Sequence, residues 1–293
     1  MNIEVYQFKP MLKPVIAGYM VKELITNYPQ GRHYITLDLG FSVSPILISG
    51  HEIYLEEYDE VLKLDYLKEM RIKENSVYIV ESGMLKEISL YSNGKYYRLM
   101  AVRNCKAPTL EINGIHMHRI KDICPWDDAA SKVKMLGIRK GDLILDTCTG
   151  LGYTAIASLR FGARKVFTIE IDENVLTISG LNPWSRFLEN KNITVLLGNT
   201  FDAIDYFKDN IFDKVIHDPP RFSLAGELYS EKFYHKLFRV IKPKGRLFHY
   251  IGKPGEAIGR KSITKGVINR LMKVGFIIIC KVDIGVIAQK PRF

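Results

Sequence analysis

The chain after residue 125 alternates between short apolar segments and helical patterns, and this alternation restricts the fold more than any other feature. Seven apolar segments are expected to be strands, and helical patterns of roughly 10 to 15 residues separate the first six. Such an order builds a parallel sheet with helices on both faces. The seven segments read DLILDTC, KVFTIEID, ITVLLGN, DKVIHD, RLFHYIG, FIIICKV and IGVIAQK.

The connection between the last two predicted strands is short, with only a few residues around Asp283. Because a parallel crossover needs a dozen or more residues, the seventh strand is expected to return antiparallel as a hairpin. Residues 126–293 are therefore predicted to form an α/β domain with a seven-stranded sheet whose last strand is antiparallel.

The first part of the chain has a different texture. Its apolar residues mostly alternate with polar ones, as in HYITLDLGFSVSPILI, and SNGK is typical of a hairpin turn. Residues 1–125 are therefore predicted to form a second, smaller and mainly β domain.

Composition excludes several classes of protein. With 47% apolar and 25% charged residues the chain is globular, and no signal peptide or run of 18 apolar residues occurs in the sequence, so we expect a cytoplasmic protein without a membrane partner. Cys105, Cys124, Cys148 and Cys280 form no CxxC pair and no histidine cluster lies near them. This spacing argues against a zinc site and against a disulfide framework.

The net charge of +10 comes from the second part alone. Residues 1–125 carry 15 basic and 15 acidic side chains, whereas residues 126–293 carry 27 basic and 17 acidic ones. A basic excess first favours solubility, and it indicates a nucleic-acid partner only where the charges gather. They gather between Arg239 and Lys265, where eight basic residues accompany one acid.

The first predicted strand of the α/β part ends in a glycine-rich turn, DTCTGLGYTA. Asp146 and Thr149 end the strand, and Gly150 and Gly152 open the following helix, which lets a ligand approach the backbone and the helix amides. Glu170 ends the second strand about 20 residues later, where a carboxylate can accept both hydroxyls of a ribose. The ordered pair predicts a nucleotide-type ligand.

A dinucleotide fits this turn poorly. The third glycine of the dinucleotide pattern is absent, since Tyr153, Thr154 and Ala155 follow Gly152. Asp146 would also repel a pyrophosphate, so the turn favours a cationic ligand.

With these residues, the second part resembles the class I S-adenosylmethionine-dependent methyltransferases, a Rossmann-like fold. The whole chain looks like a predicted archaeal methyltransferase family with a β-rich N-terminal extension. The resemblance implies S-adenosylmethionine as cofactor and no metal. It implies Asp146 near the methionine moiety, the two glycines beneath the cofactor and Glu170 on its ribose, with Thr149 also binding the cofactor. Asn199, in LLGNTFDAI, takes the place of the acid that usually flanks the adenine.

The segment HDPPRF, at the end of the fourth predicted strand, matches the D/N-P-P-aromatic motif of methyltransferases that act on amino groups. The resemblance implies that Asp218 and the Pro219 carbonyl accept hydrogen bonds from a planar nitrogen beside the cofactor, while the prolines keep the loop rigid. Arg221 stands where the family has an aromatic residue, and Phe222 follows it. An arginine there can stack on a base or grip a carboxylate or phosphate. Asp218 can instead be a helix cap, and Arg221 can instead form an ion pair with a nearby acid. His217 is expected to be a core residue.

The loop after the fifth predicted strand, YIGKPGEAIGRKS, lies on the cofactor side of the sheet. Its basic residues Lys253, Arg260 and Lys261 can clamp a phosphate backbone or can belong to a mobile surface loop.

Four functions stay open from the sequence. N-methylation of an RNA base is favoured, because the motif, the basic second part and the extra domain agree with it. A small-molecule amine methyltransferase would use Arg221 for an anionic group of its substrate. An aminopropyltransferase of polyamine synthesis shares the fold, but the basic surface and the lack of a second acid beside Asp218 argue against it. A cofactor-binding scaffold without activity is the fourth.

Overall fold

The computed structural model describes residues 3–252 and 260–292, with only the backbone of residues 260–262. The chain forms two compact units. We call the first the α/β unit; it comprises Met1–Gln7, Ala129–Glu173 and Leu188–Phe293. The second, the β-rich unit, comprises Phe8–Asp128 and Asn174–Phe187. The boundary expected from the sequence, at residues 125 and 126, stays a prediction.

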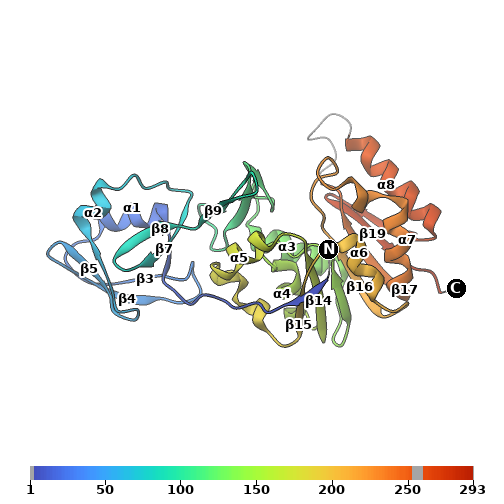
Figure 1. Ribbon diagram of the computed structural model, residues 1–293, viewed down its shortest axis with the longest axis horizontal. Coiled ribbons are helices and arrows are strands. Elements are labelled where there is room, and N and C mark those ends of the chain that lie inside the picture. Colours follow the sequence, from blue (N-terminus) through green and yellow to red (C-terminus); the bar gives the residue numbers. More distant parts are fainter. Residues whose placement is uncertain (1–2, 253–259, 293) are drawn as a thin grey trace. The chain divides into compact units, whose positions relative to one another are not determined.

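The α/β unit is built on one mixed sheet in the order β1-β15-β14-β13-β16-β17-β19-β18 (Figure 1). All seven expected strands are present, and β13 pairs in parallel with β14 and β16. The strands are β1 (Glu4–Tyr6), β13 (Leu143–Asp146), β14 (Lys165–Glu170), β15 (Ile193–Leu197), β16 (Phe212–His217), β17 (Ile241–Tyr250), β18 (Ile277–Val282) and β19 (Gly285–Gln289).

The two ends of this sheet differ in how well the sequence predicts them. β19 pairs antiparallel with both β17 and β18, which confirms the expected hairpin return of the last strand. The sheet has an eighth strand, however, because β1 pairs antiparallel with β15 through Glu4, Val5 and Tyr6. The prediction of seven strands was therefore one strand short.

Helices connect the strands of the sheet and cover its faces. The helix α7 begins at Ser230, whose side chain accepts a hydrogen bond from the backbone N–H of Phe233 at 3.1 Å. The helices of the α/β unit are α4 (Tyr153–Arg160), α6 (Thr200–Ala203), α7 (Glu231–Val240) and α8 (Arg260–Val274), with 3-10 turns at Ile204–Tyr206 and Gly226–Tyr229. Residues of both units occur in α3 (Pro125–Leu136), α5 (Glu173–Gly180) and the 3-10 turn Pro183–Glu189.

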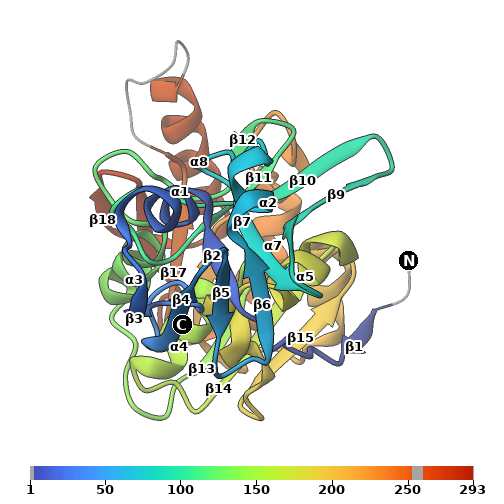
Figure 2. The same ribbon diagram turned by 90° about the vertical axis from the view of Figure 1, so that its left-hand side faces the viewer.

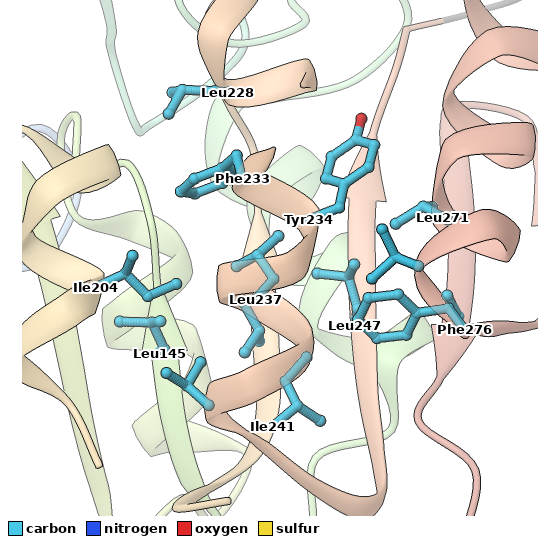
Figure 3. Packing of buried hydrophobic residues seen from close by; sticks show 14 of the residues in the cluster. Leu145, Ile204, Leu228, Phe233, Tyr234, Leu237, Ile241, Leu247, Leu271 and Phe276 are labelled. Atoms are coloured by element: carbon cyan, nitrogen blue, oxygen red, sulfur yellow. The ribbon is translucent and has the colours of Figure 1, made fainter. Parts of the chain in front are cut away.

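The core of the α/β unit lies around α7. Figure 3 shows Phe233 and Leu237 of this helix among Leu145 of β13 and Leu247 of β17, with Leu271 of α8 close by. All five side chains are fully buried. Each contributes roughly 1.5 to 3 kcal/mol through burial, which fixes the sheet strands that carry the site.

The β-rich unit contains three antiparallel sheets, in the orders β3-β4-β5-β6, β2-β7-β8 and β12-β11-β10-β9. Figure 2 shows β9 and β10 as a long hairpin. Its turn is the predicted one, with Asn93 and Gly94 both at positive φ. The strands of the β-rich unit are β2 (Val15–Ala17), β3 (Gly31–Ile35), β4 (Ser44–Ser49), β5 (Glu52–Leu55), β6 (Glu60–Lys63), β7 (Val77–Glu81), β8 (Met84–Glu87), β9 (Ser89–Ser92), β10 (Lys95–Met100), β11 (Thr109–Ile112) and β12 (Ile115–His116), with helices α1 (Gly18–Asn27) and α2 (Leu64–Glu69).

The β-rich unit also corrects the cysteine argument. Cys105 and Cys124 form a disulfide across 19 residues of sequence, with their Cα atoms 5.5 Å apart. The argument from spacing against disulfides was wrong for these two, because the intervening β11–β12 hairpin returns the chain. Within residues 3–252 and 260–292, no helix is long and apolar enough to cross a membrane.

Candidate active site

The glycine turn between β13 and α4 contains two glycines that differ in the space around them. Both have positive φ, 53° at Gly150 and 74° at Gly152. A Cβ at Gly152 would lie 2.5 Å from the side chain of the buried Leu188, whereas a Cβ at Gly150 would meet nothing within 4 Å. Gly152 is therefore required by packing, and Gly150 borders open space that a ligand can use.

Asp146, at the end of β13, is completely buried below this turn. Its Oδ2 accepts hydrogen bonds from the hydroxyls of Thr154 and Thr168, both at 2.9 Å. Its Oδ1 is buried and has no hydrogen-bond partner among the residues that the structure describes. Burial, helped by the nearby charges of Asp218 and Glu170, raises the pKa of Asp146 to about 8. A cation brought near Oδ1 would restore the ionised form.

Thr149 is bonded to the neighbouring strand β14. Its hydroxyl lies 2.7 Å from the hydroxyl of Thr168, and its N–H donates to the carbonyl of Ile169 at 2.9 Å. Only 3% of its surface is exposed. The structure therefore gives Thr149 a role in fixing the turn, and contact with a cofactor stays a prediction.

Glu170, at the end of β14, is bonded to the backbone of two segments. Its Oε2 accepts from the N–H of Gly150 at 2.9 Å, and its Oε1 accepts from the N–H groups of Ile171 and Asp172 at 3.0 and 3.1 Å. A carboxylate offers about four acceptor sites, so room for one further hydroxyl donor remains. Burial raises the pKa of Glu170.

Asn199 caps the short helix α6. Its Oδ1 accepts from the N–H of Phe201 at 2.8 Å, and its Nδ2 lies 3.4 Å from Oε1 of Glu227. The cap of this helix is Asn199 and not the acid Asp202, which lies in its first turn. A role of Asn199 at an adenine stays a prediction.

Asp218 follows β16 and forms an ion pair. Its Oδ2 accepts a hydrogen bond from Nζ of Lys132 at 2.6 Å, and 19% of the Asp218 side chain is exposed. The helix after this segment is capped by Ser230, so Asp218 is not its cap. Sequence reasoning missed Lys132, although its spacing from Asp128, Ala129, Val133 and Leu136 sets it on the buried face of α3.

A buried tyrosine holds the second proline after Asp218. The hydroxyl of Tyr229 donates to the carbonyl of Pro220 at 3.0 Å, and contact of the Pro219 carbonyl with a substrate stays a prediction. His217 is a core residue, as predicted: it is fully buried, with its Nδ1 2.8 Å from the Thr147 hydroxyl and its Nε2 3.0 Å from the carbonyl of Leu228. Burial lowers the pKa of His217 to about 3, so the imidazole is neutral.

Arg221 and Phe222 are exposed beside this loop. The structure contains no ion pair of Arg221 with any residue it describes, and the Arg221 carbonyl closes a turn by accepting from the N–H of Leu224 at 2.8 Å. Phe222 is 47% exposed, and its ring centroid lies 5.4 Å from that of Tyr229 in an edge contact. Both are accessible to a substrate.

The expected basic cluster is smaller than the sequence implies. Arg239 pairs with Asp209 and Lys242 with Asp213, each at 2.6 Å, so these two charges are balanced within the chain. Lys253 lies outside the described residues, as do the side chains of Arg260 and Lys261.

The three carboxylates therefore lie at the carboxyl ends of the central strands of the sheet. Asp146 is the last residue of β13, and Glu170 is the last residue of the neighbouring strand β14. Asp218 directly follows β16, which lies on the other side of β13. From β13 the chain continues through β14 and β15 on one side and then crosses to β16 on the other side of β13. The carboxyl ends of the strands at such a switch point are where α/β sheets bind ligands. Three carboxylates and an open glycine favour a cationic ligand with hydroxyl groups.

Comparison with known proteins gives relatives and a fold. No family model matches the chain. A Methanocaldococcus jannaschii protein named uncharacterized protein MJ1233 is 43% identical over 281 residues, covering 94% of this chain and 96% of that protein. MJ0046 of the same organism, which is named as a methyltransferase, is 32% identical over 148 residues, covering 50% of this chain and 53% of that protein.

The spermidine synthase of Thermotoga maritima has a similar structure. It aligns with a TM-score of 0.55 at 17% identity, covering 70% of this chain and 72% of that one. At this identity the likeness concerns the fold, which is the Rossmann-like fold that class I methyltransferases and polyamine synthases share.

Proposed function

Because the chain belongs to the family of the Methanocaldococcus jannaschii protein MJ1233, whose name assigns no activity, we propose its function from the site. The protein is an S-adenosylmethionine-dependent methyltransferase that modifies a nitrogen of an RNA base. One observation carries this proposal: Asp146, Glu170 and Asp218 lie at the carboxyl ends of three neighbouring strands, next to a glycine turn in which Gly150 borders open space.

The residues present fit S-adenosylmethionine. The cofactor is a nucleoside with two ribose hydroxyls, a sulfonium and an α-ammonium group. The remaining acceptor site of Glu170 suits a ribose hydroxyl, and the Oδ1 of Asp146 suits a positive charge. Gly150 supplies the close approach that a nucleoside needs. The relative MJ0046, named as a methyltransferase, supports the assignment.

The cofactor supplies a sulfonium methyl group that is reactive without a metal. With the cofactor bound, the acceptor nitrogen would form the new N–C bond with its lone pair while the C–S bond breaks, so that the sulfur would leave as a neutral thioether and the nitrogen would then lose a proton to solvent. Asp218 and the Pro219 carbonyl hold the N–H groups of the acceptor and direct its lone pair. Catalysis is therefore positioning and electrostatics.

An RNA base is supported by charge. The net charge is +10, and residues 126–293 carry all of the basic excess. Arg221 and Phe222 are exposed beside Asp218, where an arginine plane and an aromatic ring can stack on a base. A small-molecule amine, with Arg221 on an anionic group, is the second candidate, and the aminopropyl transfer of polyamine synthesis is the third, since the fold is similar to spermidine synthase.

Transfer of a labelled methyl group from S-adenosylmethionine to total RNA, followed by mass spectrometry of the nucleosides, tests the proposal. One methylated nucleoside is expected with the wild type. Asp218→Ala is expected to lower transfer by ~100-fold or more while cofactor affinity stays within a few-fold. Methyl transfer to small amines alone would contradict the RNA assignment, as would transfer of an aminopropyl group from decarboxylated S-adenosylmethionine to a diamine with release of methylthioadenosine. Loss of cofactor binding in Asp218→Ala would contradict the catalytic role of Asp218.

A further inference from the structure

Lys132 is a charged residue at the site for which no role has been given so far. Lys132 lies on α3, and its side chain is 2% exposed. Lysine is almost never this buried unless it is paired. Its Nζ is 2.6 Å from Oδ2 of Asp218 and 4.5 Å from the centroid of the Tyr250 ring, at the end of β17.

Both neighbours favour the charged form of this lysine. A carboxylate within hydrogen-bond distance and the negative face of an aromatic ring each stabilise an ammonium group. Lys132 and Asp218 thus form an ion pair, in which the lysine places a positive charge directly beside the carboxylate that would face an acceptor.

We infer that Lys132 is a specificity-determining residue that makes the acceptor site select a neutral planar nitrogen, such as the amino or ring nitrogen of a nucleobase, and reject a protonated amine. This inference rests on the proposed function, because it takes the acceptor nitrogen to lie beside Asp218.

The charge balance at the site gives the reason. Asp218 interacts electrostatically with Asp146, which already lies near Glu170. Without Lys132, this edge of the sheet would present three acidic groups and would attract amines in their protonated form, which have no lone pair for the methyl group. With Lys132, an ammonium group at Asp218 would lie beside a second cation and be repelled by it, whereas a neutral N–H donor carries no charge for the lysine to repel.

A purely structural role, in which Lys132 only ties α3 to the loop after β16, makes a different prediction. A structural lysine would affect the binding of all ligands of the cofactor site alike. A specificity role depends on the charge of the ligand at the acceptor position, and two cofactor analogues that differ there can separate the two roles.

The probes are S-adenosylhomocysteine, which lacks the methyl group, and sinefungin, which carries a protonated amine in its place. The ratio of their Kd values, from calorimetry on one variant, reports the charge at the acceptor position and cancels any general loss of stability. Lys132→Met is expected to shift this ratio on the order of tenfold toward sinefungin, and Lys132→Arg, the matched control, is expected to keep the wild-type ratio.

Asp218→Asn provides a second variant that keeps the shape of the pair. It leaves Lys132 without its counter-charge, so the ratio is expected to shift on the order of tenfold toward S-adenosylhomocysteine. Ratios that stay at the wild-type value in both Lys132→Met and Asp218→Asn would overturn the inference and leave the proposed function intact. Failure of the wild type to bind either analogue would overturn the proposed function, and the inference with it.

Discussion

Asp146 is the buried carboxyl group whose replacement gives the sharpest prediction. Asp146→Asn keeps an oxygen for the hydroxyls of Thr154 and Thr168 and removes the ionisable group. The variant is expected to unfold at a higher denaturant concentration than the wild type at pH 8, in the absence of ligand, and to lose this advantage at pH 5.

The magnitude follows from the pKa of Asp146, which burial raises from 3.8 to about 8. Between these values the folded protein holds a proton that the unfolded chain has lost. The free energy of unfolding of the wild type therefore falls as pH rises, by ~1.4 kcal/mol per pH unit from this group. Its stabilising effect is complete below about pH 4 and lost above about pH 8, a difference of ~6 kcal/mol that Asp146→Asn does not experience.

Guanidinium chloride unfolding of both proteins at intervals from pH 5 to 9 measures the effect. Other titrating groups act on both proteins, so the difference between the two free energies isolates Asp146. This difference is expected to change in favour of the variant up to about pH 8 and to stay constant above it. A difference that is independent of pH would show that Asp146 is ionised in the folded protein and would refute the reasoning.

Three further predictions concern the glycine turn, the disulfide and the buried imidazole. Gly152→Ala is expected to lower the free energy of unfolding by ~2–4 kcal/mol, and Gly150→Ala by only ~1–2 kcal/mol. Gly150→Ala is also expected to lower the affinity for S-adenosylmethionine at least tenfold in calorimetry. Equal losses of stability in the two variants would contradict the packing argument. Serine at both Cys105 and Cys124 is expected to cost about 3 kcal/mol in thermal unfolding, and an unchanged Tm would contradict a stabilising disulfide. Because burial lowers the pKa of His217 to about 3 from 6.5, the stability linked to this group is complete above about pH 6.5 and is lost as pH falls toward 3. His217→Gln is expected to flatten unfolding free energy against pH in that range, and an unchanged slope would contradict a neutral imidazole.

The elements of the α/β unit could be predicted because their signals are local. Each strand of β13 to β19 is a short apolar segment between helical patterns, and the chain length between β18 and β19 alone requires an antiparallel return. His217 could be assigned to the core for the same reason, since it lies within such a segment.

Contacts between distant segments could not be predicted in this way. The Lys132–Asp218 pair joins residues 86 apart, β1 adds to β15 from the other end of the chain, and Cys105 meets Cys124 through a hairpin. None of these pairings leaves a local pattern of its own. The position of Lys132 on the buried face of α3 was the one available sign, because a lysine on such a face needs a partner.

Calorimetric titration of the purified protein with S-adenosylmethionine and with NAD, at pH 7.5, tests the central claim most directly. The account predicts saturable binding of S-adenosylmethionine with one site per chain, weakened at least tenfold in Gly150→Ala, and no binding of NAD. Saturable binding of NAD without any binding of S-adenosylmethionine would contradict it.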